Sequence, residues 1–564
     1  MNAGATSLQD AYDVVILGGG LAGLCLALQL KQARPETSVL VVEKARHPVP
    51  EAAHKVGESS VEIGAHYFTR VLGQIDHFRS DQLPKLGLRY FFDGPGVKPA
   101  NIDLTDRTEL GGNTFFPTPS FQIDRGRFEN HLGEQIRAAG AHLLDGAAVR
   151  GVELAEDSGP HRVSIEAADG DTAQVQARWV VDASGRSSLL KRKLKLGKKN
   201  NHDVNSVWWR YDRRIKVDDW STDARWHDHT GGSRQRWLST VHLMGAGYWV
   251  WLIPLASGSH SIGIVADQKL HPFSTLSTYE KAMAWLEAHE PQCCSRLRAV
   301  EADGGQLQDF LGYKDFSYSC QQVYDAPHRW ALVGEAGPFL DPFYSPGSDY
   351  IGLGNTFVTD LIRRDLAGEK RLATRSEVYN RIFFNFYDNH LSLYEGQMPM
   401  WGNARVMALK IIWDFAYYWV LPAAFFFHGY LTDMMLYAEH RDRLDGLAAL
   451  NRSVQALFRA WHEAGTAAGH DRPSPGFVNI PGVPFMYELN RGLGDTLDRD
   501  AFVARLVANL ALLDRVAGEI ASAARQDVPA VDLGPLASHA DASGEPELLA
   551  SVLPLLARDD LAAK

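Results

Sequence analysis

The sequence predicts a mixed α/β protein with an inserted, mainly antiparallel sheet and a helical C-terminal region. Residues 12–17 form an apolar, β-branched run that leads through a glycine turn into a leucine-rich helical pattern. Two later apolar runs, at residues 178–182 and 330–334, also end in turns that contain glycine and an acidic residue. From about Ser376 the pattern becomes helical and aromatic. Apolar strands that run into turns and helices are typical of an α/β sheet, and the late helices predict a separate region.

The first strand and turn have the spacing of a dinucleotide-binding motif. Gly18, Gly20 and Gly23 form G-x-G-x-x-G directly after the apolar run. Such glycines let the backbone approach a pyrophosphate, whose charge lies at the N-terminus of the next helix. A second predicted strand, residues 38–43, ends at Glu43, twenty residues after Gly23. Glu43 is therefore placed to accept hydrogen bonds from an adenosine ribose.

The two later strands indicate that this dinucleotide is FAD. The first ends at Asp182, and the second leads into Gly334 and Glu335, with Pro342 and Gly347 following before another helical pattern. Three strand-to-turn elements this far apart resemble the single-FAD fold of the aromatic hydroxylase superfamily. That resemblance implies an FAD-binding, Rossmann-like domain in which these five residues lie along the cofactor.

An arginine element supports the same superfamily. Residues 122–128 contain Arg125 directly before a helical pattern and resemble the arginine element of these enzymes. The alternative is that Arg125 forms a structural salt bridge at the start of a helix.

A tryptophan pair makes the resemblance more specific. Trp249 and Trp251 point to the same face of a predicted strand, and an aromatic pair in a strand is usually part of a core. Residues 249–254, however, match the W-x-W-x-I-P signature of flavin-dependent halogenases. Residues 83–91 resemble the segment that bears the catalytic lysine of that family, which here is Lys85. The alternative for Lys85 is a solvated loop lysine.

The resemblance covers about the first 375 residues and implies a mechanism. In that family a separate flavin reductase delivers FADH2, and O2 with chloride or bromide yields hypohalous acid. The tryptophans keep the organic substrate from the flavin, and the lysine presents electrophilic halogen to an electron-rich ring. The loop that contains Lys55 and Ser59 also resembles a halogenase loop and is expected to contact the cofactor.

Two positions depart from the family pattern. Tyr344 stands where halogenases of free tryptophan carry a glutamate, which favours phenol-like, pyrrole-like or carrier-bound substrates. Pro346 has no N–H, although family members bind halide partly through consecutive backbone N–H groups in this turn. Gly347 and Ser348 are the remaining pair of candidate donors for a halide.

Composition narrows the partners and the compartment. The net charge of −11 argues against nucleic acid as a partner. The four cysteines show no metal-ligand spacing or paired framework, which favours a cytoplasmic location, and residues 227–229 are too short a cluster to predict a metal. The basic residues 191–199 could dock an acidic acyl or peptidyl carrier protein or the reductase, or form a solvated loop.

We expect residues 1–375 to form the FAD-binding module, with the substrate-side sheet drawn from about 81–120 and 200–320. Residues 376–564 are expected to form the helical region. Its aromatic stretch is interrupted by Asp414 and Pro422, which argues against a membrane span. Core packing, a lid over the substrate, or peripheral contact with a membrane surface stay open for it.

The predicted function is an FADH2-dependent halogenase that acts on an electron-rich aromatic or conjugated substrate. The alternatives are an FAD-dependent monooxygenase or oxidoreductase that kept the scaffold without using halide, and a non-catalytic flavoprotein or membrane-surface scaffold. Substrate identity, the choice of halide and the oligomeric state do not follow from the sequence.

Overall fold

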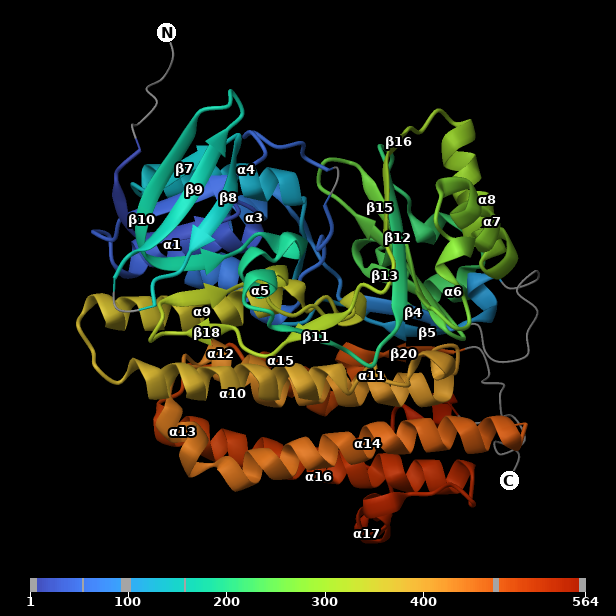
Figure 1. The fold of residues 1–564 in the computed structure, drawn as a ribbon. Coiled ribbons are helices and arrows are strands. Elements are labelled where there is room, and N and C mark those ends of the chain that lie inside the picture. The colour runs from blue at the N-terminus through green and yellow to red at the C-terminus, as the bar shows by residue number, and fades with distance from the viewer. Residues whose placement is uncertain (1–7, 53–54, 93–102, 157–158, 470–475, 557–564) are drawn as a thin grey trace. The chain divides into compact units, whose positions relative to one another are not determined.

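The computed structural model describes residues 8–52, 55–92, 103–156, 159–469 and 476–556, which form two compact units (Figure 1). The first unit contains residues 1–82, 123–200 and 317–386. The second contains residues 83–122, 201–316 and 387–564. The helical C-terminal region thus falls largely within the same unit as the inserted segments.

The first unit is built on an eight-stranded sheet, in which six strands follow the order β18-β19-β10-β1-β2-β7. Strands β7, β2, β1, β10 and β19 are mutually parallel, whereas β8 and β9 extend β10 as an antiparallel ribbon. Its strands are β1 Ala11–Leu17, β2 Val39–Glu43, β7 His142–Asp145, β8 Ala147–Glu153, β9 His161–Ala167, β10 Thr172–Asp182, β18 Tyr324–Asp325 and β19 Trp330–Leu332.

Helices and short turns complete this unit. A small separate ribbon pairs β11 Gly197–Lys199 with β17 Tyr318–Cys320. The helical elements are α1 Leu21–Ala33, α2 Glu62–His66, the π-helical turn η1 Tyr67–Val71, α3 Ile75–Asp81, α4 Arg125–Ala138, η4 Gly185–Ser187, α5 Leu189–Lys193, η8 Gly334–Ala336, η9 Pro342–Tyr344 and α9 Gly347–Leu366. Helix α10 Leu372–Leu391 runs from this unit into the second.

The parallel strands explain why the predicted turns belong together. The carboxyl ends of parallel strands lie at one edge of a sheet. Strands β19, β10, β1 and β2 are consecutive neighbours, with Asp182 of β10 opposite Leu17 of β1. The turns that follow these four strands therefore lie along one edge of the first unit.

The second unit contains another eight-stranded sheet, of order β16-β12-β15-β14-β13-β4-β5-β20. Its neighbours are antiparallel except for the pairs β13–β4 and β5–β20. The strands are β4 Leu88–Phe92, β5 Thr108–Gly111, β12 Val204–Tyr211, β13 Thr240–Gly245, β14 Tyr248–Pro254, β15 His260–Asp267, β16 Leu307–Tyr313 and β20 Phe477–Asn479. The two-residue strands β3 Leu83–Pro84 and β6 Phe121–Gln122 pair separately.

One face of this sheet packs on helices α7 Tyr279–His289 and α8 Pro291–Ala302 (Figure 1). Val250 and Leu252 of β14 belong to that hydrophobic core, together with Leu286 of α7 and Leu297 of α8. The shorter helical elements of these segments are η3 Leu104–Asp106, η5 Val217–Asp219, α6 Ala224–Asp228, η6 Arg236–Leu238 and η7 Phe273–Thr275.

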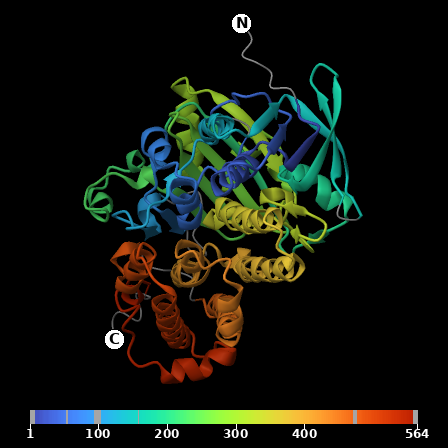
Figure 2. The ribbon, with the colours of Figure 1, turned by 90° about the vertical axis from the view of Figure 1, so that its left-hand side faces the viewer.

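The C-terminal part of this unit is helical, and Figures 1 and 2 show its long helices α14 and α16 side by side. Its elements are η10 Met398–Met400, α11 Ala404–Tyr418, the π-helical turn η11 Trp419–Ala423, α12 Ala424–Phe427, α13 Met434–Glu439, α14 Arg441–Ala467, η12 Ile480–Gly482, α15 Pro484–Gly492, α16 Arg499–Asp527, η13 Gly534–Leu536, α17 Ala537–Ala542 and η14 Leu553–Leu556.

The aromatic stretch of this region packs as core. Within the described residues, one helical stretch, Ala404–Phe427, is long and apolar enough to cross a membrane, and 83% of its most apolar window is buried in the protein. Asp414 forms a buried ion pair with Lys410, with 2.5 Å between the carboxylate oxygen and Nζ, and Pro422 lies in the π-helical turn. This burial supports the core-packing interpretation, because many of the aromatic side chains of the stretch pack between helices. Peripheral contact of this region with a membrane stays a prediction.

Candidate active site

The glycine turn after β1 has a shape that fits a pyrophosphate. Gly18 has a φ of +113°, and a Cβ there would lie 2.5 Å from the carbonyl oxygen of Ala183. A Cβ on Gly23 would lie 2.0 Å from the carbonyl oxygen of Gly18. At Gly20, by contrast, an added Cβ would meet no atom of the described chain within 4 Å. The first and third glycines therefore allow close backbone packing, and the middle one borders open space at the start of α1.

Glu43 lies beside this turn, at the carboxyl end of β2. Its Oε2 accepts a hydrogen bond of 2.7 Å from the backbone N–H of Gly19, and its Oε1 accepts one of 2.8 Å from that of Ala45. An ionised carboxylate has about four acceptor positions, so these two bonds orient the group and leave capacity for ribose hydroxyls. The predicted ribose contact fits this position and stays a prediction.

Asp182, at the end of β10, holds its own turn together. Its Oδ1 accepts hydrogen bonds from the N–H and the hydroxyl of Ser184, at 3.0 and 2.6 Å, and its Oδ2 accepts one of 2.7 Å from the N–H of Leu190. The side chain is buried, and this burial raises the pKa of its carboxyl group above the usual range. Asp182 thus joins β10 to α5, and its direct contact with a cofactor stays a prediction.

The turn after β19 lies against α1, the helix that follows the glycine motif. Gly334 has a φ of +56°, and a Cβ there would lie 2.9 Å from Cβ of Ala22 in α1. Glu335 follows in η8, where one carboxylate oxygen lies 3.9 Å from a guanidinium nitrogen of Arg186. The backbone oxygen of Glu335 accepts a hydrogen bond of 2.7 Å from the hydroxyl of Tyr318. The last of the three predicted turns therefore lies next to the first.

Lys55 and Arg125 share one buried carboxylate. Both form ion pairs with Glu129 of α4, and Arg125 does so at 2.7 Å. Arg125 also donates to the carbonyl oxygen of Val56, and a Cβ on Gly57 would lie 2.7 Å from its Nη1. Burial, followed by the charge of Arg125, lowers the pKa of Lys55 to about 8. The salt bridge considered for Arg125 is present, and the contact of Lys55 and Arg125 with a cofactor stays a prediction.

The turn before α9 brings together two segments that are distant in sequence. The hydroxyl of Ser345, a residue with a φ of +57°, donates a 2.9 Å hydrogen bond to the hydroxyl of Ser59. Pro346 then caps α9, with Gly347 and Ser348 as its first two residues. The first N–H groups of an α-helix have no acceptor within the helix, so these two are the donors that this turn offers to an anion. An added Cβ on Gly347 would meet no described atom within 4 Å.

Sequence reasoning missed the residues that position this turn. The N–H of Gly64, in α2, donates a 2.8 Å hydrogen bond to Oδ1 of Asp349. A Cβ on Gly64 would lie 2.2 Å from Oγ of Ser348, so only glycine fits there. No sequence pattern relates residues 285 positions apart. Glu129, in contrast, lies four residues after Arg125, a helical spacing that could have been used.

The second unit carries the tryptophan pair on β14. Trp249 and Trp251 are both buried, with ring centroids 5.6 Å apart. Trp251 donates a 3.1 Å hydrogen bond from Nε1 to Oγ of Ser261, and Trp249 packs against His242 at 5.1 Å. Because side chains alternate along a strand, the pair faces away from the core formed by Val250 and its neighbours. Gly263 lies opposite Trp251, and its lack of a side chain lets the indole lie against β15.

Lys85 is buried in the same unit, with 2% of its surface exposed. This contradicts the alternative of a solvated loop lysine. The backbone N–H of Lys85 donates a 2.9 Å hydrogen bond to the carbonyl oxygen of Ser120. The next N–H, of Leu86, donates one of 3.0 Å to the carbonyl oxygen of Leu238. The segment that carries Lys85 is therefore held from both sides, three residues before β4.

A buried charge cluster anchors the strand that follows Lys85. Glu109 of β5 forms ion pairs with Arg89 of β4 and with Arg236, the latter bidentate at 2.9 and 3.0 Å. Arg89 also donates a 3.3 Å hydrogen bond to Oγ of Ser239, whose hydroxyl donates to the carbonyl oxygen of Leu86. Buried charges are costly unless they are paired, so this cluster fixes a single arrangement of the segment.

The structure therefore presents the predicted site residues in two sets. The first unit holds the glycine motif, the ribose acid, the two cations and the turn before α9, and the second holds Lys85 and the tryptophan pair. Within the described ranges, no group of three or more His, Cys, Asp or Glu side chains is arranged to hold a metal.

Comparison with known proteins shows which proteins this chain is similar to. A model of the FAD binding domain matches residues 11–245. A flavin-dependent halogenase of Dictyostelium discoideum, chlA, is 27% identical over 488 residues, which cover 80% of this chain and 77% of that protein. The 1H-pyrrole-2-carbonyl-(peptidyl-carrier protein) chlorinase of Pseudomonas fluorescens is 29% identical over 359 residues, which cover 60% of this chain and 72% of the chlorinase.

The fold has solved counterparts. The crystal structure of halogenase PltM in complex with phloroglucinol and FAD superposes with a TM-score of 0.63 at 16% identity, over 88% of this chain and 96% of that one. The fold and the cradle for FAD define the protein as a flavin-dependent oxidoreductase with an aromatic hydroxylase-like fold. Within that class, the chain is similar to flavin-dependent halogenases, at 27% and 29% identity to the two relatives named above. The predicted fold class and cofactor are thereby confirmed, and so is the predicted resemblance to flavin-dependent halogenases.

Proposed function

We propose that this halogenase is a two-component enzyme that receives FADH2 from a separate flavin reductase and halogenates a small aromatic or carrier-bound substrate. The observation that carries the proposal is the buried Lys85 in the same unit as the buried tryptophan pair. A chlorinase and a brominase of carrier-bound pyrrole are among the relatives, at 29% and 26% identity, and both act on an electron-rich ring. Tyr344, in place of an acidic residue, supports the same class of substrate.

FAD would be held by the residues of the first unit. The open space beside Gly20 fits the pyrophosphate, Glu43 the ribose, and the cations Lys55 and Arg125 the anionic groups. When bound as FADH2, the cofactor supplies, with O2 and halide, hypohalous acid. The backbone N–H groups of Gly347 and Ser348 would hold the chloride or bromide. Pro346 removes one donor, so two consecutive amides at the start of α9 carry this role.

Trp249 and Trp251 would form the barrier between flavin and organic substrate. Both indoles are packed, and Trp251 is held by Ser261 and by the flat surface that Gly263 leaves. A wall that moves little excludes a ring-sized substrate better than a mobile one.

Lys85 would present the halogen to the substrate. Its ammonium donates a hydrogen bond to the oxygen of hypohalous acid, which polarises the oxygen–halogen bond. The π electrons of the ring form the new carbon–halogen bond, the oxygen–halogen bond breaks, and its electron pair stays on oxygen. The oxygen takes a proton and leaves as water, and the ring carbon loses its proton. A buried ammonium suits this role, because few waters compete for its hydrogen bonds.

The test is Lys85→Met, assayed with an independent flavin reductase, FAD, O2, bromide and an electron-rich phenol. Flavin reoxidation is expected to continue at the wild-type rate while halogenated product disappears. Lys31→Met is the matched control, because Lys31 is also buried, in α1, and is expected to keep activity. Product formation by Lys85→Met would refute the assigned role.

The same assay separates the alternative oxidoreductase without halide use. Pro346 is the observation that favours that alternative. A hydroxylated product that forms equally with and without bromide would support it. Product that depends on bromide or chloride would exclude it.

We also propose a cytoplasmic location and an acidic docking partner. All four cysteines are free thiols in the structure, as is usual in a reducing compartment. In the basic segment, Lys191 is buried and donates a 2.6 Å hydrogen bond to the carbonyl oxygen of Gly337, so it anchors the segment. Lys193, Lys195 and Lys198 are exposed and offer positive charge to a carrier protein or the reductase. Charge reversal there should weaken binding to a carrier protein at low salt without changing bromination of a free phenol.

A further inference from the structure

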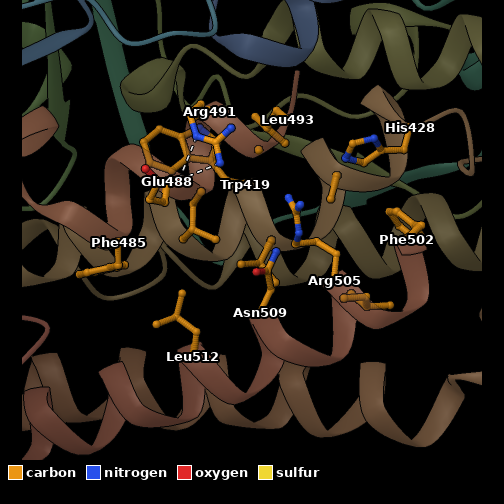
Figure 3. A pocket seen from close by; sticks show the side chains of 15 residues that line it. Trp419, His428, Phe485, Glu488, Arg491, Leu493, Phe502, Arg505, Asn509 and Leu512 are labelled. Atoms are coloured by element: carbon orange, nitrogen blue, oxygen red, sulfur yellow. Dashed lines mark hydrogen bonds and ion pairs between the residues drawn. The ribbon is translucent and has the colours of Figure 1, made fainter. Parts of the chain in front are cut away.

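The C-terminal helices of the second unit line a partly open cavity of about 330 Å³ (Figure 3). It lies among η11, α12, α15 and α16. Sites for small molecules have volumes of about 300 to 1,000 Å³ and are lined mainly by apolar side chains with a few polar groups. Aromatic rings of Trp419, Phe485 and Phe502 contribute to this lining, together with Leu506. The cavity thus has the volume and the apolar lining expected of a site for a ring-containing molecule.

Polar groups stand on two parts of the wall, and those on one part, Glu488 and Arg491 of α15, form an ion pair of 2.8 Å with each other. Figure 3 shows Arg505 between Asn509 of the same helix and His428. Arg505 forms an ion pair of 3.0 Å with Asp495, which uses part of the five donors of its guanidinium. Burial, with the charge of Arg505, lowers the pKa of His428, so its imidazole is neutral near pH 7. The cationic group at this part of the cavity is therefore the guanidinium of Arg505, which has N–H groups that Asp495 does not use.

The indole of Trp419 adds a second donor. Trp419 is 2% exposed, and its Nε1 finds no hydrogen-bond acceptor among the described atoms. An indole N–H can only donate, and a buried donor without an acceptor is unfavourable. A ligand that brings an acceptor into this cavity would satisfy it.

We propose that this cavity binds an aromatic acid, a molecule with a planar apolar body and a carboxylate or comparable oxyanion. The body would lie against Phe485 and Phe502, and the oxyanion would accept hydrogen bonds from Trp419 Nε1 and Arg505. Hydrogen bonds to a charged acceptor are about twice as strong as those between neutral groups, which favours an anion over a neutral phenol.

The cavity is connected to the segment that carries Lys85. The ring of Trp419 packs edge-on against Phe116, with centroids 5.1 Å apart. Asn490 of α15 accepts a 2.9 Å hydrogen bond from the backbone N–H of Thr118, two residues after Phe116. That segment ends at Ser120, whose carbonyl oxygen holds the backbone of Lys85. Binding of a ligand in the cavity should therefore stabilise residues 116–120. An effect of that ligand on halogen transfer by Lys85 is the one part of this inference that rests on the proposed function.

The test is isothermal titration of the full chain with 1-anilinonaphthalene-8-sulfonate, an aromatic sulfonate. One site is expected per chain. Trp419→Phe keeps the ring and removes the donor, so binding should weaken by at least about tenfold. Leu512→Trp, at the half-buried edge of the cavity, should fill it and abolish binding. Val507→Trp is the matched control, because Val507 lies on the same helix but is 40% exposed and outside the lining.

Wild-type affinity in Trp419→Phe would overturn the proposal, as would undiminished binding by a folded Leu512→Trp. Circular dichroism shows whether each variant is folded, and Trp419→Phe decides the matter if Leu512→Trp is not. Hydrogen exchange of residues 116–120 should slow when the sulfonate binds, and unchanged exchange would overturn the connection to Lys85. Neither measurement needs FADH2, O2 or halide, so failure here is distinct from failure of the halogenase mechanism.

Discussion

The position of Trp251 can be changed without touching a residue of the proposed active site. Gly263 lies opposite Trp251 in the adjacent strand, and a Cβ there would lie 2.1 Å from Cζ2 of the indole. Carbon atoms in contact are about 3.5 to 4.0 Å apart. In Gly263→Ala the six-membered ring must therefore move by at least about 1.4 Å.

The energetic cost follows from the same contacts. Overpacking a tight site costs about 1–3 kcal/mol. Movement of the indole also removes the 3.1 Å hydrogen bond from Trp251 to Ser261, which contributes about 1 kcal/mol. Replacing a glycine within a strand by alanine returns about 0.5–1 kcal/mol. The free energy of unfolding should therefore fall by about 1–3.5 kcal/mol when the three effects are added.

Urea denaturation measures this loss, and the coupled assay measures its consequence. Flavin reoxidation should continue, while halogenated product per flavin oxidised should fall because the displaced indole leaves a gap in the barrier. In a Trp251→Ala background the extra methyl has room, so Gly263→Ala should then cost nothing further. Gly197→Ala is the control, since a Cβ there meets no described atom within 4 Å. A cost that persists without Trp251, or unchanged stability of Gly263→Ala, would refute the reasoning.

Three further changes test other parts of the structure. Because the pKa of Lys55 is lowered to about 8, its side chain is charged below that pH and neutral above it. The affinity of the apoprotein for FAD should therefore fall as the pH rises through 8. In a fluorescence titration, Lys55→Arg should remove this fall. Glu109→Gln removes the carboxylate that Arg89 and Arg236 share and leaves Arg236 only Asp218, at 3.7 Å. Urea denaturation should therefore show a loss of roughly 3–5 kcal/mol, and a loss below about 1 kcal/mol would contradict the paired cluster. Gly20→Ala should keep the wild-type Tm but bind FAD at least about tenfold more weakly, because its methyl enters only the space assigned to the pyrophosphate; unchanged FAD binding would contradict that assignment.

The cofactor site of the first unit was largely predictable because its parts are local patterns. The glycine spacing, the apolar strands and the acid at the end of β2 each reflect a requirement of a few neighbouring residues. Parallel strands then place their turns at one edge, so Gly18, Asp182 and Gly334 could be assigned to one site before any coordinates. The pairing of Arg125 with Glu129, four residues later, was accessible in the same way.

The environment of individual side chains was not predictable in this way. Lys85 had two interpretations, solvated or catalytic, and only the packing of segments far apart in the chain shows that it is buried. In the sequence Asp414 interrupts an apolar stretch, but its ion pair with Lys410 and the burial of both side chains depend on the helices around them. The contact between Ser59 and Ser345, 286 residues apart, has no sequence signal at all.

The sequence by itself therefore determined the fold class, the cofactor and the resemblance to flavin-dependent halogenases, because strand periodicity, glycine conformation and motif spacing act over short stretches of chain. The tertiary structure alone decided which charges are buried and paired, how Lys85 is held, and where the C-terminal helices leave a cavity. These properties depend on what lies across from a residue in space, and burial and pairing energies are set by neighbours that local pattern does not specify.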